Sequence, residues 1–259
     1  MRVVSLDAPG QLRLTERPAP PLAPGHVRVA MRAAGVCSSD IARSHGGAYH
    51  HPLVLGHELA GIVQAHGEGA EAPPLGTGVT IFPLLPCFAC PPCAEEQYAR
   101  CLDYDYFGSR RDGGFASNLD VPAWNLLPVP SGVSLDDAAL TEPLAVVVHA
   151  LERLRESREP TRICILGSGF LALLAVAVLQ RSPRDVAITV VGRHPHKLQR
   201  AEALGARVVS SAEHEAFFDA SAGSFDAVLE AVGAPETFAQ ALALAAPGGR
   251  VVWMGNPSG

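Results

Sequence analysis

Four of the six cysteines fall within fifteen residues, in the spacing C-x2-C-x2-C-x7-C formed by Cys87, Cys90, Cys93 and Cys101. In a cytoplasmic chain, thiols this dense usually bind a metal and do not form disulfides. Four thiolates without an open coordination position describe a closed, tetrahedral, structural zinc site. The alternative is a set of reduced surface cysteines, but the prolines at 86, 91 and 92 shape the loop and favour the metal site.

A second set of possible metal ligands is dispersed along the chain. Cys37 lies in GVCSSD beside Ser39 and Asp40, His57 and Glu58 lie in LGHE, and Glu142 lies in TEP. One thiolate, one imidazole and one or two carboxylates leave a coordination position for water or substrate, as a catalytic zinc requires. Singly, a cysteine or histidine is more often a core residue than a ligand, so the combination carries the prediction.

A glycine-rich turn follows the apolar run RICIL: Gly167, Ser168, Gly169, Phe170 and Leu171 form G-x-G-x-x-A with Ala172. Because the turn follows a predicted strand and opens a predicted helix, its backbone amides can receive a pyrophosphate. The alternative is a tight turn between a strand and a helix. Cys164, inside the preceding strand, is expected to be a small buried hydrophobe.

The end of the next predicted strand bears on the choice of cofactor. An NAD-binding fold places an acidic residue there, about twenty residues after the glycine turn, whereas this chain has Gly192 and Arg193. Glycine leaves room for a 2′-phosphate, and Arg193 with Lys197 can bind it. The sequence therefore predicts a preference for NADP over NAD, unless Arg193 is an ordinary exposed arginine. Val232 is also expected to contact the cofactor.

The first half of the chain is expected to be rich in β-strands. Fifteen of the 22 prolines lie in the first 130 residues, and proline interrupts helices and central strands. Short β-branched runs predict strands at 27–30, 60–63 and 79–82, separated by turn-rich stretches at 16–25 and 67–76.

The second half alternates between strands and helices. A long helix is predicted at 137–155, broken at Pro143, with a charged linker at 151–160. Strands are predicted at 162–166, 186–191, 206–210, 225–233 and 249–255, and helices at 171–180, 197–204 and 235–245. Val- and Ile-rich strands spaced by helices indicate a parallel sheet that is buried on both faces.

The predicted fold class is therefore α/β, with a β-rich domain at 1–150 and a doubly wound domain at 151–259. The second domain has five strands where the dinucleotide-binding fold usually has six, and the chain ends at Gly259. We therefore expect it to be incomplete at its C-terminus, with its last strand an exposed edge.

Composition excludes several classes of protein. With 48% apolar and 18% charged residues, the chain has ample material for a core and is not disordered. Its 26 acidic against 20 basic residues give a net charge of −6, which argues against nucleic-acid binding. The apolar run at 170–179 is too short to span a membrane, and no secretory signal precedes it, so a cytoplasmic location is expected.

The order GVCSSD, GHE, CFACPPC, TEP and GSGFLA resembles the medium-chain zinc-dependent alcohol dehydrogenase family. Residues 83–116 look most like the galactitol-1-phosphate 5-dehydrogenases and related polyol dehydrogenases. The resemblance implies a GroES-like catalytic domain, a Rossmann domain, and zinc and nicotinamide that meet in a cleft. It also implies that Cys37, His57 and Glu142 bind the catalytic zinc, that Glu58 is an alternating ligand or supports the ligands, and that Ser39 begins a proton relay. The four clustered cysteines match the family's structural-zinc ligands.

The expected activity is hydride transfer between a secondary alcohol of a polyol, sugar phosphate or cyclitol and NADP or NAD. A ketone reductase is the second possibility, and a catalytically silent zinc- and nucleotide-binding remnant is the alternative from another class. The expected partner is a small alcohol or ketone. A homo-oligomer is possible, although the strand that helps form the interface in dimeric relatives is missing.

Two features concern the substrate and its proton. Many family members carry a relay histidine three residues after the serine, where this chain has Ala42, so His45, His50 and His51 are the candidate replacements. In GSRRDGG, Arg110 or Arg111 is expected to bind an anionic or polyhydroxy substrate, because a guanidinium suits phosphate. The alternative is a pair of arginines on a solvated turn.

Overall fold

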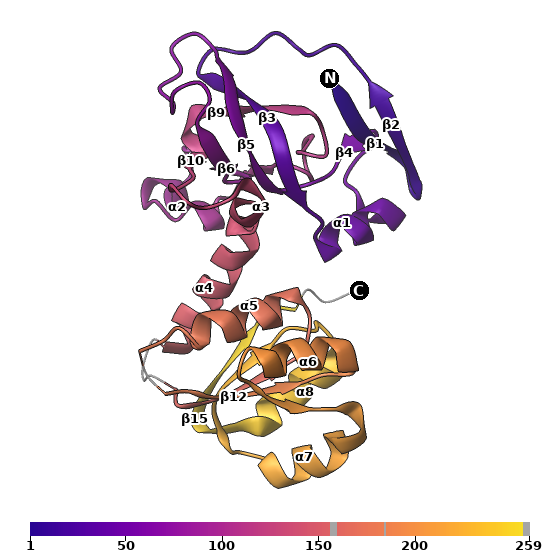
Figure 1. Cartoon of the computed structure of the whole chain (residues 1–259), viewed down its shortest axis with the longest axis vertical. Helices are drawn as coiled ribbons and strands as arrows, with labels where there is room; N and C mark the ends of the chain where they lie inside the picture. Colours follow the sequence, from indigo (N-terminus) through magenta and orange to yellow (C-terminus); the bar gives the residue numbers. More distant parts are fainter. Residues whose placement is uncertain (156–159, 184, 256–259) are drawn as a thin grey trace. The chain divides into compact units, whose positions relative to one another are not determined.

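The computed structural model describes residues 1–155, 160–183 and 185–255. The chain divides into two compact units, Met1–Glu142 and Pro143–Gly259 (Figure 1). The predicted domain boundary after residue 150 falls inside helix α4 (Thr141–Arg155) and stays a prediction. No helix among the described residues has both the length and the apolar character needed to cross a membrane.

The first unit is built mainly from antiparallel strands. Its larger sheet has the order β10-β6-β5-β3-β9, and a smaller sheet has the order β2-β1-β4. Their bounds are β1 Arg2–Ala8, β2 Gln11–Glu16, β3 His26–Gly35, β4 Leu53–Val54, β5 Glu58–His66, β6 Gly78–Ile81, β9 Asn118–Pro122 and β10 Leu126–Pro128. The three strands predicted from β-branched runs fall on β3, β5 and β6, so the β-rich prediction is confirmed.

Alternation along these strands places the core. Val27 and Val29 are fully buried, whereas Arg28 between them pairs with Asp120 on the neighbouring strand β9. This is the period of two that a strand with one buried face requires.

Short elements connect the strands and carry several of the predicted site residues. They are α1 Ser38–Ala42, the π-helical turn η1 Arg43–Gly47, β7 Leu84–Leu85, α2 Pro91–Ala94, the 3-10 turn η2 Tyr98–Arg100, β8 Asp105–Tyr106, the 3-10 turn η3 Ala123–Asn125 and α3 Leu135–Ala138.

The predicted helix at 137–155 is two helices, α3 and α4, separated at residues 139–140 and not at Pro143. Pro143 lies in the first turn of α4, where its missing N–H costs no hydrogen bond. The linker predicted at 151–160 is wrong at its start, because Leu151 and Leu154 are buried residues of α4. Residues 156–159 lie outside the described part of the chain.

The second unit contains a parallel sheet with the order β13-β12-β11-β14-β15, which confirms the predicted doubly wound α/β fold (Figure 1). Its elements are β11 Arg162–Leu166, α5 Phe170–Leu179, β12 Ala187–Val191, α6 Pro195–Ala203, β13 Arg207–Val209, the 3-10 turn η4 Ser211–Glu213, α7 His214–Ser221, β14 Phe225–Glu230, α8 Pro235–Leu244 and β15 Ala245–Trp253. Asn256 to Gly259, where the sequence ends, lie outside the described residues.

Strand β11 shows that both faces of this sheet are covered. Ile163 and Ile165 pack in one apolar cluster with residues of α4, α5 and α6. Cys164 and Leu166 point to the other face, into a cluster with residues of α7 and α8. Cys164 has no exposed surface, so the prediction that it is a buried hydrophobe is confirmed.

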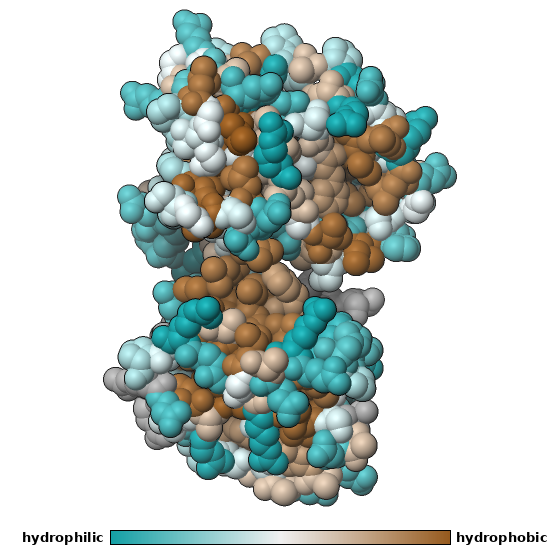
Figure 2. Space-filling view, in the orientation of Figure 1, coloured by the Kyte–Doolittle hydropathy of each residue, from teal (hydrophilic) through white to brown (hydrophobic). Residues whose placement is uncertain are grey.

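The sequence missed helix α7 and placed the start of β15 four residues too late. Helix α7 has eight residues, too few for the apolar period to stand out, although its Phe217 is buried in the core. Helix α5 is apolar on every face, and Figure 2 shows hydrophobic residues gathered over it and hydrophilic residues over α6. The strand predicted at 225–233 ends earlier, at Glu230, because the Glu230 carboxylate accepts hydrogen bonds from the N–H groups of Val232 and Gly233.

Candidate functional site

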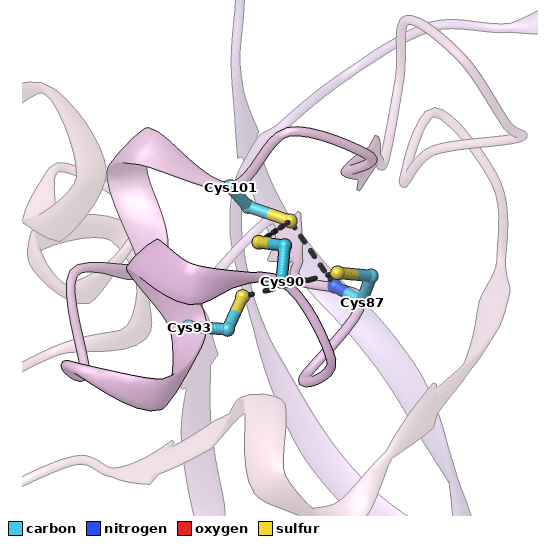
Figure 3. A group of neighbouring side chains, drawn as sticks. All are labelled: Cys87, Cys90, Cys93 and Cys101. Carbon is cyan, nitrogen blue, oxygen red and sulfur yellow. Dashed lines mark hydrogen bonds between the residues drawn. The ribbon is translucent and has the colours of Figure 1, made fainter.

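The four clustered cysteines point toward one another from α2 and the loops around it (Figure 3). Their sulfur atoms all lie within 4.8 Å of one another. The Cys87 and Cys93 sulfurs are 4.0 Å apart, and those of Cys90 and Cys101 are 3.9 Å apart. Four sulfurs placed 2.3 Å from a central zinc ion are separated by about 3.8 Å, so the donor set fits a tetrahedral zinc.

Backbone amides of the same loop support negative charge on these sulfurs. The N–H of Cys87 donates to the Cys101 sulfur at 3.2 Å, and the N–H of Leu102 donates to the Cys90 sulfur at 3.5 Å. The latter bond lowers the pKa of Cys90 to about 6, whereas burial raises the pKa of Cys93 to about 12. A bound cation would let all four ionise, which supports the predicted structural-zinc role.

A second group joins Cys37, His57 and Glu58, whose ligand atoms also lie within 4.8 Å of one another. The pairing of β3 with β5 brings them together, because Gly35 lies opposite Glu58 and Cys37 follows two residues later. Gly35 has to be glycine here, since a Cβ would stand 1.9 Å from the Glu58 Oε2 atom. These three side chains supply the thiolate, imidazole and carboxylate that the sequence predicted.

The Asp40 carboxylate contacts two members of the second group, Cys37 and His57. Its buried carboxylate accepts a hydrogen bond from the Cys37 N–H at 3.0 Å and lies 3.4 Å from His57 Nδ1. Burial lowers the pKa of His57, but the neighbouring Asp40 and Cys37 outweigh it and raise that pKa to about 10. A carboxylate in this position orients a ligand histidine and increases its basicity.

The acidic groups around His57 crowd one another. Burial raises the pKa of Glu58, and the charges of Glu142 and Asp40 raise it further. Burial also raises the pKa of Cys37, but hydrogen bonds with His57 and Ser39 leave it below its usual value. A divalent cation would relieve this repulsion, so the donor set fits a catalytic zinc.

Glu142 does not join the group of three in this structure. It lies at the start of α4, where Tyr106 Oη donates a hydrogen bond to its Oε1 at 3.1 Å. The Tyr106 ring also packs edge-on against the His57 ring, with centroids 5.9 Å apart. Burial and the Glu142 charge raise the pKa of Tyr106 well above its usual range. The role of Glu142 as a zinc ligand stays a prediction.

A pocket of about 450 Å³ opens beside this group, with Ser39, Arg43, Tyr49, His57, Tyr104 and Tyr106 among its lining residues. Arg43 Nη1 donates a hydrogen bond to Ser39 Oγ at 2.7 Å. Arg43 was not among the residues predicted from the sequence, although the spacing from Ser39 to Arg43 is one that brings side chains together on a helical turn. Tyr106 was not predicted either, because its sequence surroundings offer no local signal.

None of the three candidate relay histidines is hydrogen-bonded to Ser39, and two of them have other hydrogen-bond partners among the described residues. His45 Nδ1 contacts the Ile41 carbonyl and Ser44 Oγ. The His50 ring contacts the carbonyls of Pro52 and Arg110, and His51 Nε2 is buried without a partner. No hydrogen bond found in this part of the chain joins any of the three to Ser39.

The two arginines of GSRRDGG have different surroundings. Arg111 pairs with Asp105 at 2.6 Å. The Arg110 guanidinium lies over the rings of Tyr104 and Tyr49, 4.2 and 5.2 Å from their centroids. Arg110 lines a neighbouring pocket and is not among the lining residues that surround His57.

The glycine-rich turn of the second unit has the geometry of an anion-binding loop. Gly167 has a φ of +109°, which favours glycine, and Gly169 caps α5 with open space where a Cβ would stand. Helix α5 therefore presents its first N–H groups beside a free surface. Ser168 is buried, Phe170 is half-exposed, and Leu171 is partly buried against the core.

Two more predicted cofactor residues contact this turn. A Cβ on Gly192 would stand 2.6 Å from Ser168 Oγ, and a Cβ on Gly167 would stand 3.0 Å from Val232 Cγ2. Arg193 is exposed and Lys197 is half-buried near the start of α6. Their cofactor contacts stay predictions.

Glu230, at the end of β14, is a fully buried carboxylate that the sequence analysis did not single out. It accepts hydrogen bonds from the N–H of Val232 at 2.9 Å, the N–H of Gly233 at 3.0 Å and Thr237 Oγ1 at 2.7 Å. Glu230 thus shapes the loop that places Val232 against the glycine turn.

Comparison with known proteins agrees with these two units. Residues 23–131 match the alcohol dehydrogenase GroES-like domain, and residues 172–259 match the zinc-binding dehydrogenase family. Galactitol 1-phosphate 5-dehydrogenase of Escherichia coli K12 is 33% identical over 263 residues, which cover 99% of this chain and 75% of that protein. The crystal structure of the Escherichia coli galactitol-1-phosphate dehydrogenase superposes with a TM-score of 0.90 at 32% identity, covering 100% of this chain and 76% of that one.

Two further solved structures contain nicotinamide cofactors. A zinc-binding dehydrogenase of Sinorhizobium meliloti 1021, bound to NADP, superposes with a TM-score of 0.92 at 29% identity. The match covers 99% of this chain and 77% of that structure's chain. RspB of Escherichia coli CFT073, bound to NADH, superposes with a TM-score of 0.91 at 29% identity. The match covers 100% of this chain and 77% of that structure's chain.

The chain belongs to the zinc-dependent medium-chain alcohol dehydrogenases. It is an alcohol dehydrogenase with a GroES-like domain and a Rossmann-like domain, as the sequence predicted.

Proposed function

We propose that the chain oxidises a secondary alcohol of a polyol or polyol phosphate by hydride transfer to NADP, with one catalytic and one structural zinc. The single observation that carries the proposal is the grouping of Cys37, His57 and Glu58 beside a pocket that His57 lines. The similarity to a galactitol 1-phosphate 5-dehydrogenase supports a polyol phosphate as the substrate class. Relatives named as dehydrogenases favour an enzyme over a silent remnant.

The residues of this site have separable roles. Cys37, His57 and Glu58 or Glu142 would hold the catalytic zinc, and a Lewis acid there lowers the pKa of an alcohol. Asp40 orients His57. Ser39 accepts a hydrogen bond from Arg43, and a guanidinium has no acceptor atom, so Ser39 cannot pass a proton to Arg43. A proton at Ser39 Oγ therefore has to leave through another group or water.

Metal analysis combined with a turnover assay tests the proposal. We expect two zinc ions per chain and cofactor reduction that depends on a polyol from a panel of free and phosphorylated hexitols. One zinc per chain together with no turnover of any polyol would support the remnant instead.

The preference for NADP is proposed from Gly192 and Arg193. Its test is the ratio of kcat/KM for the two cofactors, before and after the combined change Gly192→Asp and Arg193→Ile. Because a Cβ at position 192 meets Ser168 Oγ, the same pair should also be made with Ser168→Gly, which opens that space. A wild-type preference for NAD, or a ratio that moves in neither background, would contradict the assignment.

A further inference from the structure

The described residues that line the pocket beside His57 include one permanent positive charge and no negative charge. Of the ten described residues that line it, Arg43 carries the one permanent charge and none has a carboxylate. Tyr49, Tyr104, Tyr106 and Ser109 add hydroxyl groups. Such a lining offers hydrogen bonds to a polyhydroxylated ligand and one strong cationic donor group.

The Arg43 guanidinium has N–H groups that are available to a ligand. Its hydrogen bond to Ser39 Oγ uses one of five N–H groups, and across the described residues no carboxylate forms an ion pair with it. Arg43 is half-buried, so a ligand in the pocket can reach it while part of its hydration is already lost. Partly desolvated guanidinium groups bind carboxylates and phosphates more strongly than exposed ones.

The neighbouring pocket, which contains Arg110, suits an anion less well. Tyr49 and Tyr104 line both pockets, but the neighbouring one is also lined by Asp103 and Asp105. Asp105 is already paired with Arg111, but the Asp103 carboxylate opposes an anionic ligand there, and the Arg110 guanidinium is stacked on the two tyrosine rings. The balance of charge therefore favours Arg43.

We propose that Arg43 determines specificity by binding an anionic group, a phosphate or a carboxylate, on the polyol substrate. The proposal rests on the proposed function of the same site and names its substrate class. The hydrogen bond to Ser39 orients the guanidinium, and Arg43 and His57 line the same pocket of about 450 Å³, so one ligand in that pocket can reach both residues.

The experiment compares galactitol, galactitol 1-phosphate and galactonate as substrates of the zinc-loaded full chain. We expect the wild-type protein to give a higher kcat/KM for at least one anionic substrate than for galactitol. Arg43→Met should lower this anionic-to-neutral ratio about 10- to 100-fold, mainly through KM, because a charge-assisted pair is lost. Arg43→Lys should keep part of the preference, and Arg110→Met should leave the ratio within about threefold.

The ratio separates recognition of the anion from a general effect through Ser39, which would lower kcat for all three substrates alike. A preference for galactitol 1-phosphate identifies a phosphate as the anion, and a preference for galactonate identifies a carboxylate. Equal kcat/KM for all three substrates, or a ratio unchanged by Arg43→Met, overturns the proposal while leaving the dehydrogenase function intact. A fall in the ratio with Arg110→Met in place of Arg43→Met overturns it as well.

Calorimetric binding keeps the inference separate from the proposed function. If no polyol is oxidised, the proposed function fails, and titration of galactitol 1-phosphate and galactonate into the wild-type and Arg43→Met proteins still tests Arg43. Binding of either anion that weakens at least tenfold in Arg43→Met supports the role, and absence of binding to the wild type refutes it. Circular dichroism establishes that each variant folds, and if Arg43→Met does not, the graded loss in Arg43→Lys decides.

Discussion

Removing the buried carboxylate of Glu230 should destabilise the second unit and weaken cofactor binding. Replacement by leucine leaves the N–H groups of Val232 and Gly233 without their acceptor, whereas Thr237 Oγ1 keeps the Ala234 carbonyl at 2.9 Å. A buried donor left unsatisfied costs about 1–3 kcal/mol, and only the Gly233 N–H is buried while the Val232 N–H is partly exposed, so we expect Glu230→Leu to lower the free energy of unfolding by about 3 kcal/mol. Glu230→Gln keeps one acceptor oxygen and should cost about 1–2 kcal/mol.

Trp253 offers a local probe for this measurement. It pairs with Glu230 across β14 and β15, and its ring stacks on Phe238 at 4.7 Å. Urea denaturation followed by Trp253 fluorescence, in a Trp124→Phe background, therefore reports the second unit. Glu236→Gln is the control, because it removes an exposed carboxylate from the first turn of the neighbouring helix α8 and should lower stability by less than about 1 kcal/mol.

The relative losses of unfolding free energy in the three variants test whether the Glu230 hydrogen bonds stabilise the loop. If Glu230→Leu costs no more than Glu236→Gln, the three hydrogen bonds do not stabilise the loop. If Glu230→Gln costs as much as Glu230→Leu, the charge and not the acceptor geometry matters. Cofactor affinity should fall in the same order as stability, because Val232 packs on the glycine turn.

Three further changes address the first unit. Cys93→Ser should reduce the zinc content from two ions to one and raise amide hydrogen exchange across residues 87–102 by roughly a hundredfold, since one crosslink of the loop is lost; unchanged exchange and zinc content would refute the assignment. Cys37→Ser should remove the other zinc and abolish turnover, with the exchange of residues 87–102 unchanged; loss of the fold in circular dichroism would contradict this. Tyr106→Phe should free Glu142 from its 3.1 Å hydrogen bond and alter zinc affinity at the catalytic group, which competition with a chelator measures; an affinity equal to that of the wild type would show that this bond does not matter.

The parallel sheet was predictable because Val- and Ile-rich runs such as β11 and β12 alternate with helical segments. All five strands were predicted from the sequence, and the errors lie at their ends. Strand β14 stops at Glu230 because that side chain bonds to the N–H groups of Val232 and Gly233, and residue type alone does not reveal such a contact. Helix α7 was missed because eight residues hold barely two turns.

Residues from separate elements of the site were harder to foresee. The grouping of Cys37 with His57 depends on the register of β3 against β5, which places Gly35 opposite Glu58. Motif order suggested this grouping, but the absence of a Cβ at Gly35 is what lets the Glu58 carboxylate enter. Arg43 lies one helical turn from Ser39, and its meaning depends on tyrosines from distant loops that line the same pocket.

The two cysteine-containing sites differ in how far apart their ligands lie along the chain. The four clustered cysteines span fifteen residues, and between Cys87 and Leu102 only Cys93 and Cys101 are buried, so this loop has almost no apolar core of its own. A bound metal would crosslink this loop, and the spacing of the four cysteines predicts such a metal site. Cys37 follows β3 and Glu58 begins β5, and the pairing of these two strands in the larger sheet would hold both residues in place without a metal. We therefore expect zinc binding to be coupled to folding at the four clustered cysteines, and their local spacing alone predicts that site. The grouping of Cys37, His57 and Glu58 depends on strand register, which local spacing does not show.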